Sequence, residues 1–231
     1  MVEIKIARVS GLADWWADPK PSNDCFPSWI KDLRKEKLVD NKLNMSDCLP
    51  AIEAMLQGII IEFPVTMTFE YLGDHQKLGK MIVCDHKGYP IIGGHEFSQY
   101  KGAEFQDFHV VKVGLPWVIE VPKGYSCLFT APFNRSGNAE AFCISGVVRC
   151  DRYYNMVSIP FAIPLKKKGD VMVIEKGRPF VQIIPLKQEG VKIISSQIDM
   201  KNLETTIYQI NENPGYYKSM VREQNKSDFY E

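Results

Sequence analysis

Short apolar stretches separated by turn residues dominate the chain from residue 59 onward. Runs rich in β-branched and aromatic residues cover residues 59–72, 80–85, 107–114, 117–133, 141–150, 156–165, 169–177 and 179–187. Turn-forming pairs such as Lys123-Gly124 and Lys176-Gly177 separate several of them. Because the runs recur about every 10 residues without long helices between them, the pattern predicts an all-β fold. The expected architecture is an antiparallel β-sandwich of jelly-roll or β-clip type with a few short helices near the termini.

Helical patterns are confined to the two ends of the chain. Residues 46–58 place apolar side chains on one helical face and end at Gly58, and residues 26–38 favour a second short helix. A third helix is expected to begin at about Tyr216, in a polar tail that follows a Pro-Gly break.

The domain organisation is expected to be simple, because no change in composition marks a linker and no internal repeat is visible. We expect a single domain over residues 1–231. Residues 1–58 would form a mixed helical and extended region that packs on the sandwich, and residues 59–195 its core. Residues 196–231 would form a C-terminal tail with a short helix.

The charge balance argues against polyanionic partners. Lys plus Arg and Asp plus Glu number 28 each, so no net charge favours nucleic acid or an anionic membrane. No apolar run reaches the roughly 20 residues that span a bilayer, and the first residues lack the order of a signal peptide. We therefore expect a soluble, cytoplasmic protein, with neither membrane nor nucleic acid as a partner.

Residues 117–186 carry a series of motifs that resembles the dUTPase-like β-clip fold. The matching residues are Arg135-Ser136-Gly137, Gly146-Val147-Val148 with Asp151 and Tyr153, and Gly177-Arg178 with Gln182. The resemblance implies a nucleotide site formed by Asn134, Arg135, Asp151, Tyr153 and Gln182. It also implies that the carboxylate that activates water falls at position 149, where this chain has Arg149. Because a guanidinium cannot act as a general base, such a site would be degenerate.

The order of motifs over the whole chain is similar to an uncharacterised family of tailed bacteriophages, cyanophages and marine metagenomes. The similarity rests on "CLPAIEAMLQGIIIEFPVTM", "PWVIEVPKGYSCLFTAPFNR", "GVVRCDRYYNMVSIPF" and "KGRPFVQIIPLK". It implies a β-sandwich of viral origin, found in the host cytoplasm or in the virion, and no assigned activity. Its partners would be further copies of the chain or another phage protein.

Gln182 stands in the middle of an apolar strand and admits two interpretations. A buried amide left unpaired costs about 1–3 kcal/mol, so it needs partners. Turn backbone could supply them, in which case Gln182 joins a loop to the sheet and needs no ligand. Alternatively, it is one of the five ligand-binding candidates.

Metal chemistry has weak support in the sequence. His95 and His109 are the histidines that a cupin-like metal enzyme could use, but the expected spacing of ligands is absent. The six cysteines form no Cys-x-x-Cys pair, so buried free thiols are expected. We expect no metal and no cofactor.

Three functions of different class follow. The first is a non-enzymatic, phage-type binding or structural module, favoured by the absent catalytic constellation. The second is a degenerate nucleotide-binding or nucleotide-hydrolysing relative of dUTPase. The third is a cupin-like metal-dependent enzyme.

Overall fold

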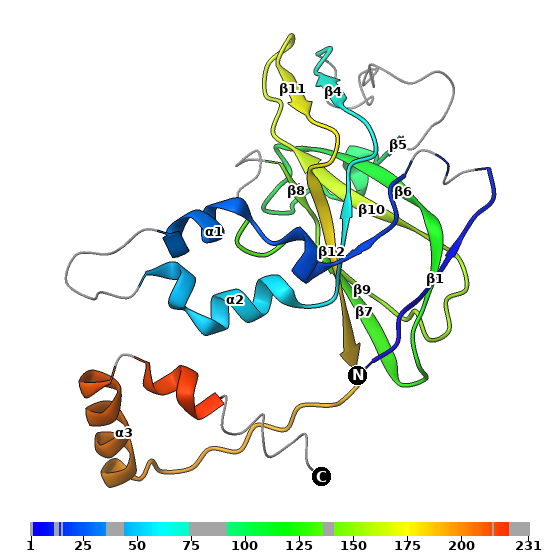
Figure 1. Cartoon of the computed structure of the whole chain (residues 1–231). Helices are drawn as coiled ribbons and strands as arrows, with labels where there is room; N and C mark the ends of the chain where they lie inside the picture. The colour runs from blue at the N-terminus through cyan, green and yellow to red at the C-terminus, as the bar shows by residue number, and fades with distance from the viewer. Residues whose placement is uncertain are drawn as a thin grey trace. The chain divides into compact units, whose positions relative to one another are not determined.

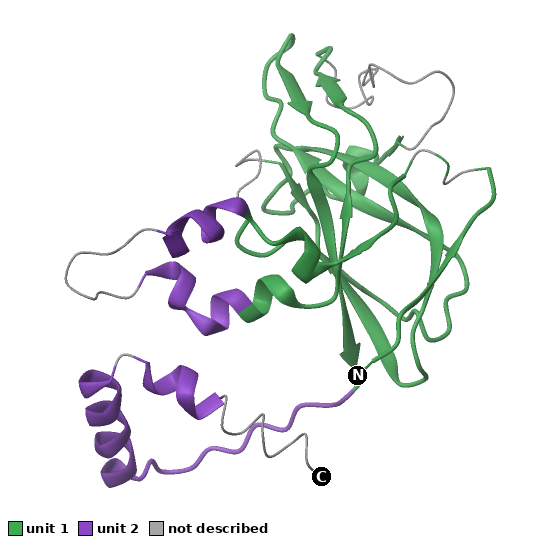
Figure 2. Cartoon of the chain, in the orientation of Figure 1, with its two compact units in different colours: residues 1–27, 53–188 green, residues 28–52, 189–231 purple. Residues whose placement is uncertain are grey.

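The computed structural model describes residues 2–11, 14, 16–35, 44–73, 92–135, 141–213 and 215–221. These residues divide into two compact units (Figure 2). The first unit consists of Met1–Pro27 and Glu53–Gln188, and the second of Ser28–Ile52 and Glu189–Glu231. Whether the whole chain is one domain, as the sequence predicts, stays a prediction.

The first unit contains two antiparallel sheets (Figure 1). One has the order β1-β6-β10-β8, and β5 also pairs with β6. Its strands are β1 (Lys5–Arg8), β5 (Ile92–Gly94), β6 (His109–Glu120), β8 (Phe142–Cys143) and β10 (Met156–Ile163). The long strand β6 organises this sheet, because β10 pairs along one edge of it and β1 and β5 share the other.

The second sheet has the order β2-β3-β12-β7-β9. Its strands are β2 (Lys20–Pro21), β3 (Ile59–Glu62), β7 (Tyr125–Thr130), β9 (Gly146–Val148) and β12 (Pro179–Lys187). A separate two-stranded ribbon pairs β4 (Met67–Glu70) with β11 (Val171–Ile174). Strand β12 is central, since it pairs with β3 on one side and β7 on the other.

The core lies between the two sheets. Every second residue of β6 points into it, and Val111, Val113 and Trp117 are each fully buried at 0% exposure. They belong to one apolar cluster with Phe129 of β7 and Ile183 of β12, from the other sheet. The prediction of an all-β antiparallel sandwich with a few short helices is confirmed.

The predicted run 59–72 forms two strands that belong to different sheets. Strand β3 ends at Glu62 and β4 begins at Met67, with Pro64 in the bend between them. The rigid ring of proline, which has no N–H to donate, explains why the chain leaves one sheet here. The predicted run 80–85 lies outside the described residues.

The helices are α1 (Ser28–Lys35), α2 (Leu49–Leu56) and α3 (Met200–Glu212), with 3-10 turns η1 (Ser22–Cys25), η3 (Met45–Asp47) and η4 (Phe97–Gln99). The sequence predicted α1 and α2 and a helical segment at Tyr216, where residues 216–221 are helical, but it missed α3. Asp199 caps α3 by accepting hydrogen bonds from the backbone of Lys201 and Asn202. Within the described residues, no helix has both the length and the apolar character needed to cross a membrane.

Gly58 ends α2 and lets the chain enter β3 at close range to β12. Its φ is +65°, and a Cβ atom built there would lie 2.0 Å from the carbonyl oxygen of Ile183. Only glycine fits, because a side chain would meet rigid backbone in a conformation that L-residues disfavour.

Replacing Gly58 by alanine should therefore lower the free energy of unfolding by at least about 2 kcal/mol, from steric overlap added to left-handed strain. Gly169→Ala is the matched control, since Gly169 also has a positive φ of +89° but nothing lies within 4 Å of its Cβ position. Urea unfolding of the three proteins measures both losses. Equal losses in the two variants would contradict the close approach to β12.

Candidate functional site

The five ligand-binding candidates lie at opposite ends of β7. Asn134, Arg135 and Gln182 gather around the loop that follows this strand, because Gln182 pairs with Thr130 at its end. Asp151 lies at the turn before the strand, where it contacts Gly124. A strand of six residues spans about 20 Å, so within one chain the five do not converge on one site.

Gln182 is fully buried and its amide is paired with backbone. Its Oε1 accepts a hydrogen bond from the N–H of Phe133 at 3.0 Å. Its Nε2 donates to the carbonyls of Ala54 at 2.9 Å and Gln57 at 2.7 Å. The side chain thus ties the loop after β7 and the end of α2 to the central strand. The structural interpretation of Gln182 is confirmed, and its binding of a ligand stays a prediction.

The loop at residues 131–135 turns sharply at Asn134. This residue has a φ of +53°, a left-handed conformation that asparagine tolerates better than most residues. Asn134 itself is exposed, and the turn carries the chain to Arg135. The residues that follow, 136–140, include Ser136 and Gly137 of the predicted motif and lie outside the described residues.

Arg135 is the unusual residue of this loop. Its Nε and Nη2 atoms are buried, and neither has a hydrogen-bond partner among the described residues. Burial lowers the pKa of Arg135, and electrostatic interactions with Cys25 and Glu62 offset this only in part. A guanidinium stays charged at neutral pH all the same. Leaving charged donors buried without an acceptor is costly, so this side chain is suited to meet an anion.

Glu62, whose charge acts on Arg135, is already engaged by two other groups. Lys20 forms an ion pair with it, with 2.7 Å between Nζ and Oε2. The Cys25 thiol lies 3.8 Å from Oε1 and donates to it. The hydrogen bond from Lys20 raises the pKa of that lysine. Sequence reasoning missed this cluster, because its members come from β2, η1 and β3 and no motif links them.

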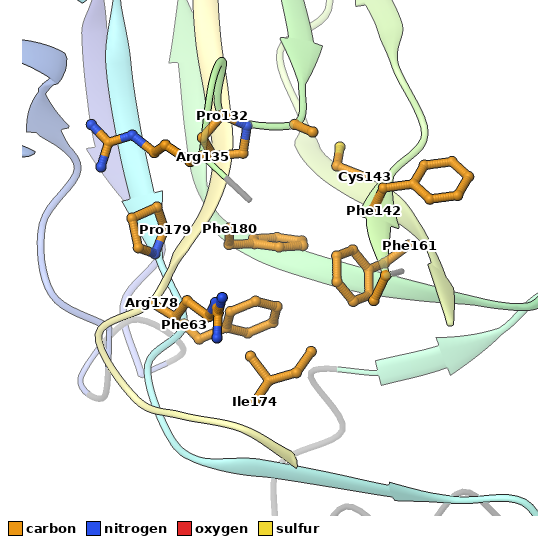
Figure 3. Close-up of a pocket in the computed structure, with 12 residues that line it drawn as sticks. Phe63, Pro132, Arg135, Phe142, Cys143, Phe161, Ile174, Arg178, Pro179 and Phe180 are labelled. Carbon is orange, nitrogen blue, oxygen red and sulfur yellow. The ribbon is translucent and has the colours of Figure 1, made fainter. Parts of the chain in front are cut away.

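A small cavity of about 60 Å³ lies beside this loop (Figure 3). Its lining comprises Phe63, Ala131, Pro132, Arg135, Ala141, Phe142, Cys143, Phe161, Ile174, Arg178, Pro179 and Phe180. The rings of Phe63, Phe161 and Phe180 contact one another, with centroids 4.6–5.7 Å apart. In Figure 3 the guanidinium of Arg135 lies beyond Pro179 from these rings, whereas Arg178 lies beside Phe63.

Among the residues that the structure describes, those that line the cavity offer no catalytic group. None of them is a carboxylate, a histidine or a hydroxyl residue. The one thiol is that of Cys143, whose pKa burial raises to about 12, so it stays protonated and is a poor nucleophile. The described part of the lining therefore combines apolar walls with the two arginines, Arg135 and Arg178.

Asp151 is a buried carboxylate with several donors around it. Its Oδ2 accepts from the N–H of Gly124 at 3.2 Å, and its Oδ1 accepts from Arg149 Nε at 3.3 Å and Gln188 Nε2 at 3.4 Å. The Nε atom of Arg152 lies 3.7 Å from Oδ2 of Asp151. Burial raises the pKa of Asp151, but the hydrogen bonds from Arg149, Gly124 and Gln188 outweigh it, so the net pKa is lowered. Arg149 thus helps to hold this turn.

The remaining candidates are peripheral. Tyr153 is 45% exposed beside the same turn. His109 is buried and its ring lies 4.4 Å from that of Tyr71, while His95 contacts Gln99. In the part of the chain that the structure describes, no three histidine, cysteine or acidic residues are grouped so as to hold a metal ion.

Comparison with known proteins gives remote matches. No family model and no curated protein matches the chain. Among solved structures, the dUTPase of Staphylococcus bacteriophage 80alpha is 12% identical, with 85% of this chain and 97% of that chain covered and a TM-score of 0.37. The dUTPase of phage phi11 of S. aureus is 11% identical, with 85% and 97% covered and a TM-score of 0.38. At this level the backbones differ widely, so these matches carry no weight for the function. The predicted relation to cyanophage or marine proteins stays a prediction.

Gln182→Leu should lower the free energy of unfolding by about 2–4 kcal/mol, because it leaves one buried N–H and two carbonyls without their partner. Gln209→Leu, an exposed glutamine on α3, is the control and should change stability by less than about 0.5 kcal/mol. Chemical denaturation measures both. A neutral Gln182→Leu would contradict the structural role of the amide.

Asp151→Asn should lower the melting temperature at neutral pH. Because the folded-state pKa of Asp151 lies below its usual value of 3.8, the carboxylate contributes stability that is present above that pH. This contribution is lost as the pH falls through the folded-state pKa, so the difference in melting temperature between the two proteins should shrink as the pH falls below 3.8. Thermal scans of both proteins from about pH 7 to about pH 3 measure this difference in melting temperature. Asp32→Asn, at an exposed ion pair, is the control and should change the melting temperature little at neutral pH.

Proposed function

We propose that this protein is a non-catalytic binding module that holds a small anionic ligand beside Arg135. The observation that carries the proposal is the pair of buried N–H donors, at Nε and Nη2, that meet no acceptor among the described residues. Folding a charged group into this state is unfavourable unless an anion completes its hydrogen bonds. A bound anion would accept the hydrogen bonds that these two donors lack.

The arginine at position 149 supports binding over hydrolysis, because a guanidinium cannot act as a general base. Arg149 stands where the dUTPase-like motif has the carboxylate that activates water, and it donates a hydrogen bond to Asp151. Asp151 in turn is buried and paired at both oxygens, at the far end of β7 from Arg135. Degenerate nucleotide binding remains the alternative, because the phosphates of a nucleotide are also anions that Arg135 could engage.

The test measures the melting temperatures of the wild type and of Arg135→Met, each with and without a small anion, at constant ionic strength. Sodium formate, acetate, sulfate and phosphate are the probes. At ten times its dissociation constant, an anion should stabilise the wild type by about 1.4 kcal/mol, or roughly 3–6 °C. Arg135→Met should show no shift. Without any anion it should be at least as stable as the wild type, since an unpaired buried charge has been removed.

Arg152→Gln is the matched control, because it removes one positive charge from the opposite end of β7 and should keep the anion response. A wild type that no anion stabilises, or an Arg135→Met variant that responds equally, would overturn the proposal. Measured turnover of dUTP by the wild type would overturn its non-catalytic part.

A further inference from the structure

We propose that Cys127 and Cys150 are a redox-sensitive pair, which closes to a disulfide when a hydroperoxide oxidises it. Cys127 lies in β7, and Cys150 follows two residues after β9 ends at Val148. The proposal does not depend on the anion site at Arg135. It is carried by three features: the pairing of β7 with β9, the contact between the two thiols and the turn that holds Cys150 in place.

The pairing of β7 with β9 brings the two cysteines together. Cys127 is the register partner of Val148, the last residue of β9. The chain then bends back, because the N–H of Cys150 donates to the carbonyl of Val148 at 2.9 Å. At this bend the thiols of Cys127 and Cys150 share a hydrogen bond, and the backbone of Cys127 also hydrogen-bonds the sulfur of Cys150. The two sulfurs are therefore neighbours while both thiols are free.

The turn after β9 is held against the start of β7. Asp151, next to Cys150, accepts hydrogen bonds from the N–H of Gly124 at 3.2 Å and from Gln188 at 3.4 Å. Cys127 and Cys150 are 0% and 3% exposed, so the fold encloses both. A disulfide stores strain when the backbone must move to form it. Because the fold already holds both segments side by side, a bond between these two sulfurs needs little rearrangement.

The two thiols are not equivalent. The hydrogen bond from Cys127 lowers the pKa of Cys150, against the opposing effects of burial and of Asp151. The same hydrogen bond, with burial, raises the pKa of Cys127. Cys150 therefore loses its proton first and is the nucleophile of the pair. It also adjoins the exposed Arg149 and Arg152, on the side from which a small oxidant would reach it.

Oxidation by a hydroperoxide balances in two steps. The Cys150 thiolate attacks one oxygen of the O–O bond, which breaks, so that Cys150 becomes a sulfenic acid and the second oxygen leaves and takes up a proton. The sulfur of Cys127 then attacks the sulfur of Cys150, the S–O bond breaks, and the oxygen leaves as water with the proton of Cys127. Two electrons pass from the two sulfurs to the peroxide. A thiol reductant reverses the change.

Peptide mass spectrometry of the full chain after treatment with hydrogen peroxide tests the proposal. Trypsin cuts after lysine and arginine, so it leaves Cys127, Cys143 and Cys150 in separate peptides, residues 124–135, 136–149 and 150–152. With the remaining thiols alkylated in denaturant, peptide 124–135 should be found joined to peptide 150–152. Dithiothreitol should separate the two.

Cys143 is the control within the same chain. It is as buried as Cys150, at 3% exposure, but its thiol donates to the carbonyl of Ile144 at 3.6 Å. The link between Cys127 and Cys150 should be about tenfold more abundant than any link to Cys143, because a disulfide forms only between sulfurs that the backbone places together. The exposed Cys48 shows that the peroxide has acted.

Two variants add a second readout. Oxidation should raise the melting temperature of the wild type and of Cys143→Ser by about 5 °C, since a disulfide constrains the unfolded chain. Cys127→Ser should show no such gain, and its Cys150 should proceed to sulfinic acid because the second thiol is missing. If Cys127→Ser does not fold, the peptide measurement on the wild type decides alone.

Three results would overturn the proposal. The first is a wild type in which Cys127 and Cys150 both stay reduced under conditions that oxidise Cys48. The second is a wild-type Cys150 that ends as sulfinic acid while Cys127 keeps a free thiol. The third is a link from either cysteine to a different one. None of them bears on anion binding at Arg135, which its own test decides.

Discussion

The amide of Gln182 must be paired because β12 is buried on both of its faces. Val181 and Ile183 point to the core between the sheets, and Gln182 points to the other side of the strand, where it is equally inaccessible. Water cannot solvate the amide there, so protein backbone has to. Its partners are the carbonyls of Ala54 and Gln57 and the N–H of Phe133. One side chain thus fixes both the end of α2 and the start of the loop that presents Arg135.

The strand pattern was predictable because it is local. Two local features predict the sandwich: buried residues alternate along β6, and Lys-Gly pairs mark the turns between strands. Both depend only on neighbours in sequence. The need of the Gln182 amide for hydrogen-bond partners could also be predicted, but from a different argument, the cost of leaving a buried amide unpaired. α3 was missed, although Asp199 and the absence of breakers in the residues that follow it are the usual signals of a helix start.

The site was harder to predict, because topology and not sequence spacing brings its groups together. Lys20 and Glu62 are 42 residues apart and meet because β2 pairs with β3. Motif order placed Arg135 and Asp151 in one site, but β7 runs its full length between them. The identity of a charged residue also does not show whether the fold will place an opposite charge beside it. Arg135 and Arg149 read alike in the sequence, and only the structure shows that Arg149 has a carboxylate partner.

Charge pairing within the fold makes Arg135 stand out. Asp151 is matched by Arg149 and Arg152, and Glu62 by Lys20. Asp170 accepts hydrogen bonds from the N–H groups of Lys166 and Lys167, which lower its pKa. Each of these carboxylates therefore has its donors close at hand. Arg135 has two buried donors with no acceptor in the described residues, and an unmatched buried charge persists only where something offsets its cost. A bound anion, as proposed, would do so by giving Arg135 the counter-charge that each of these carboxylates already has within the fold.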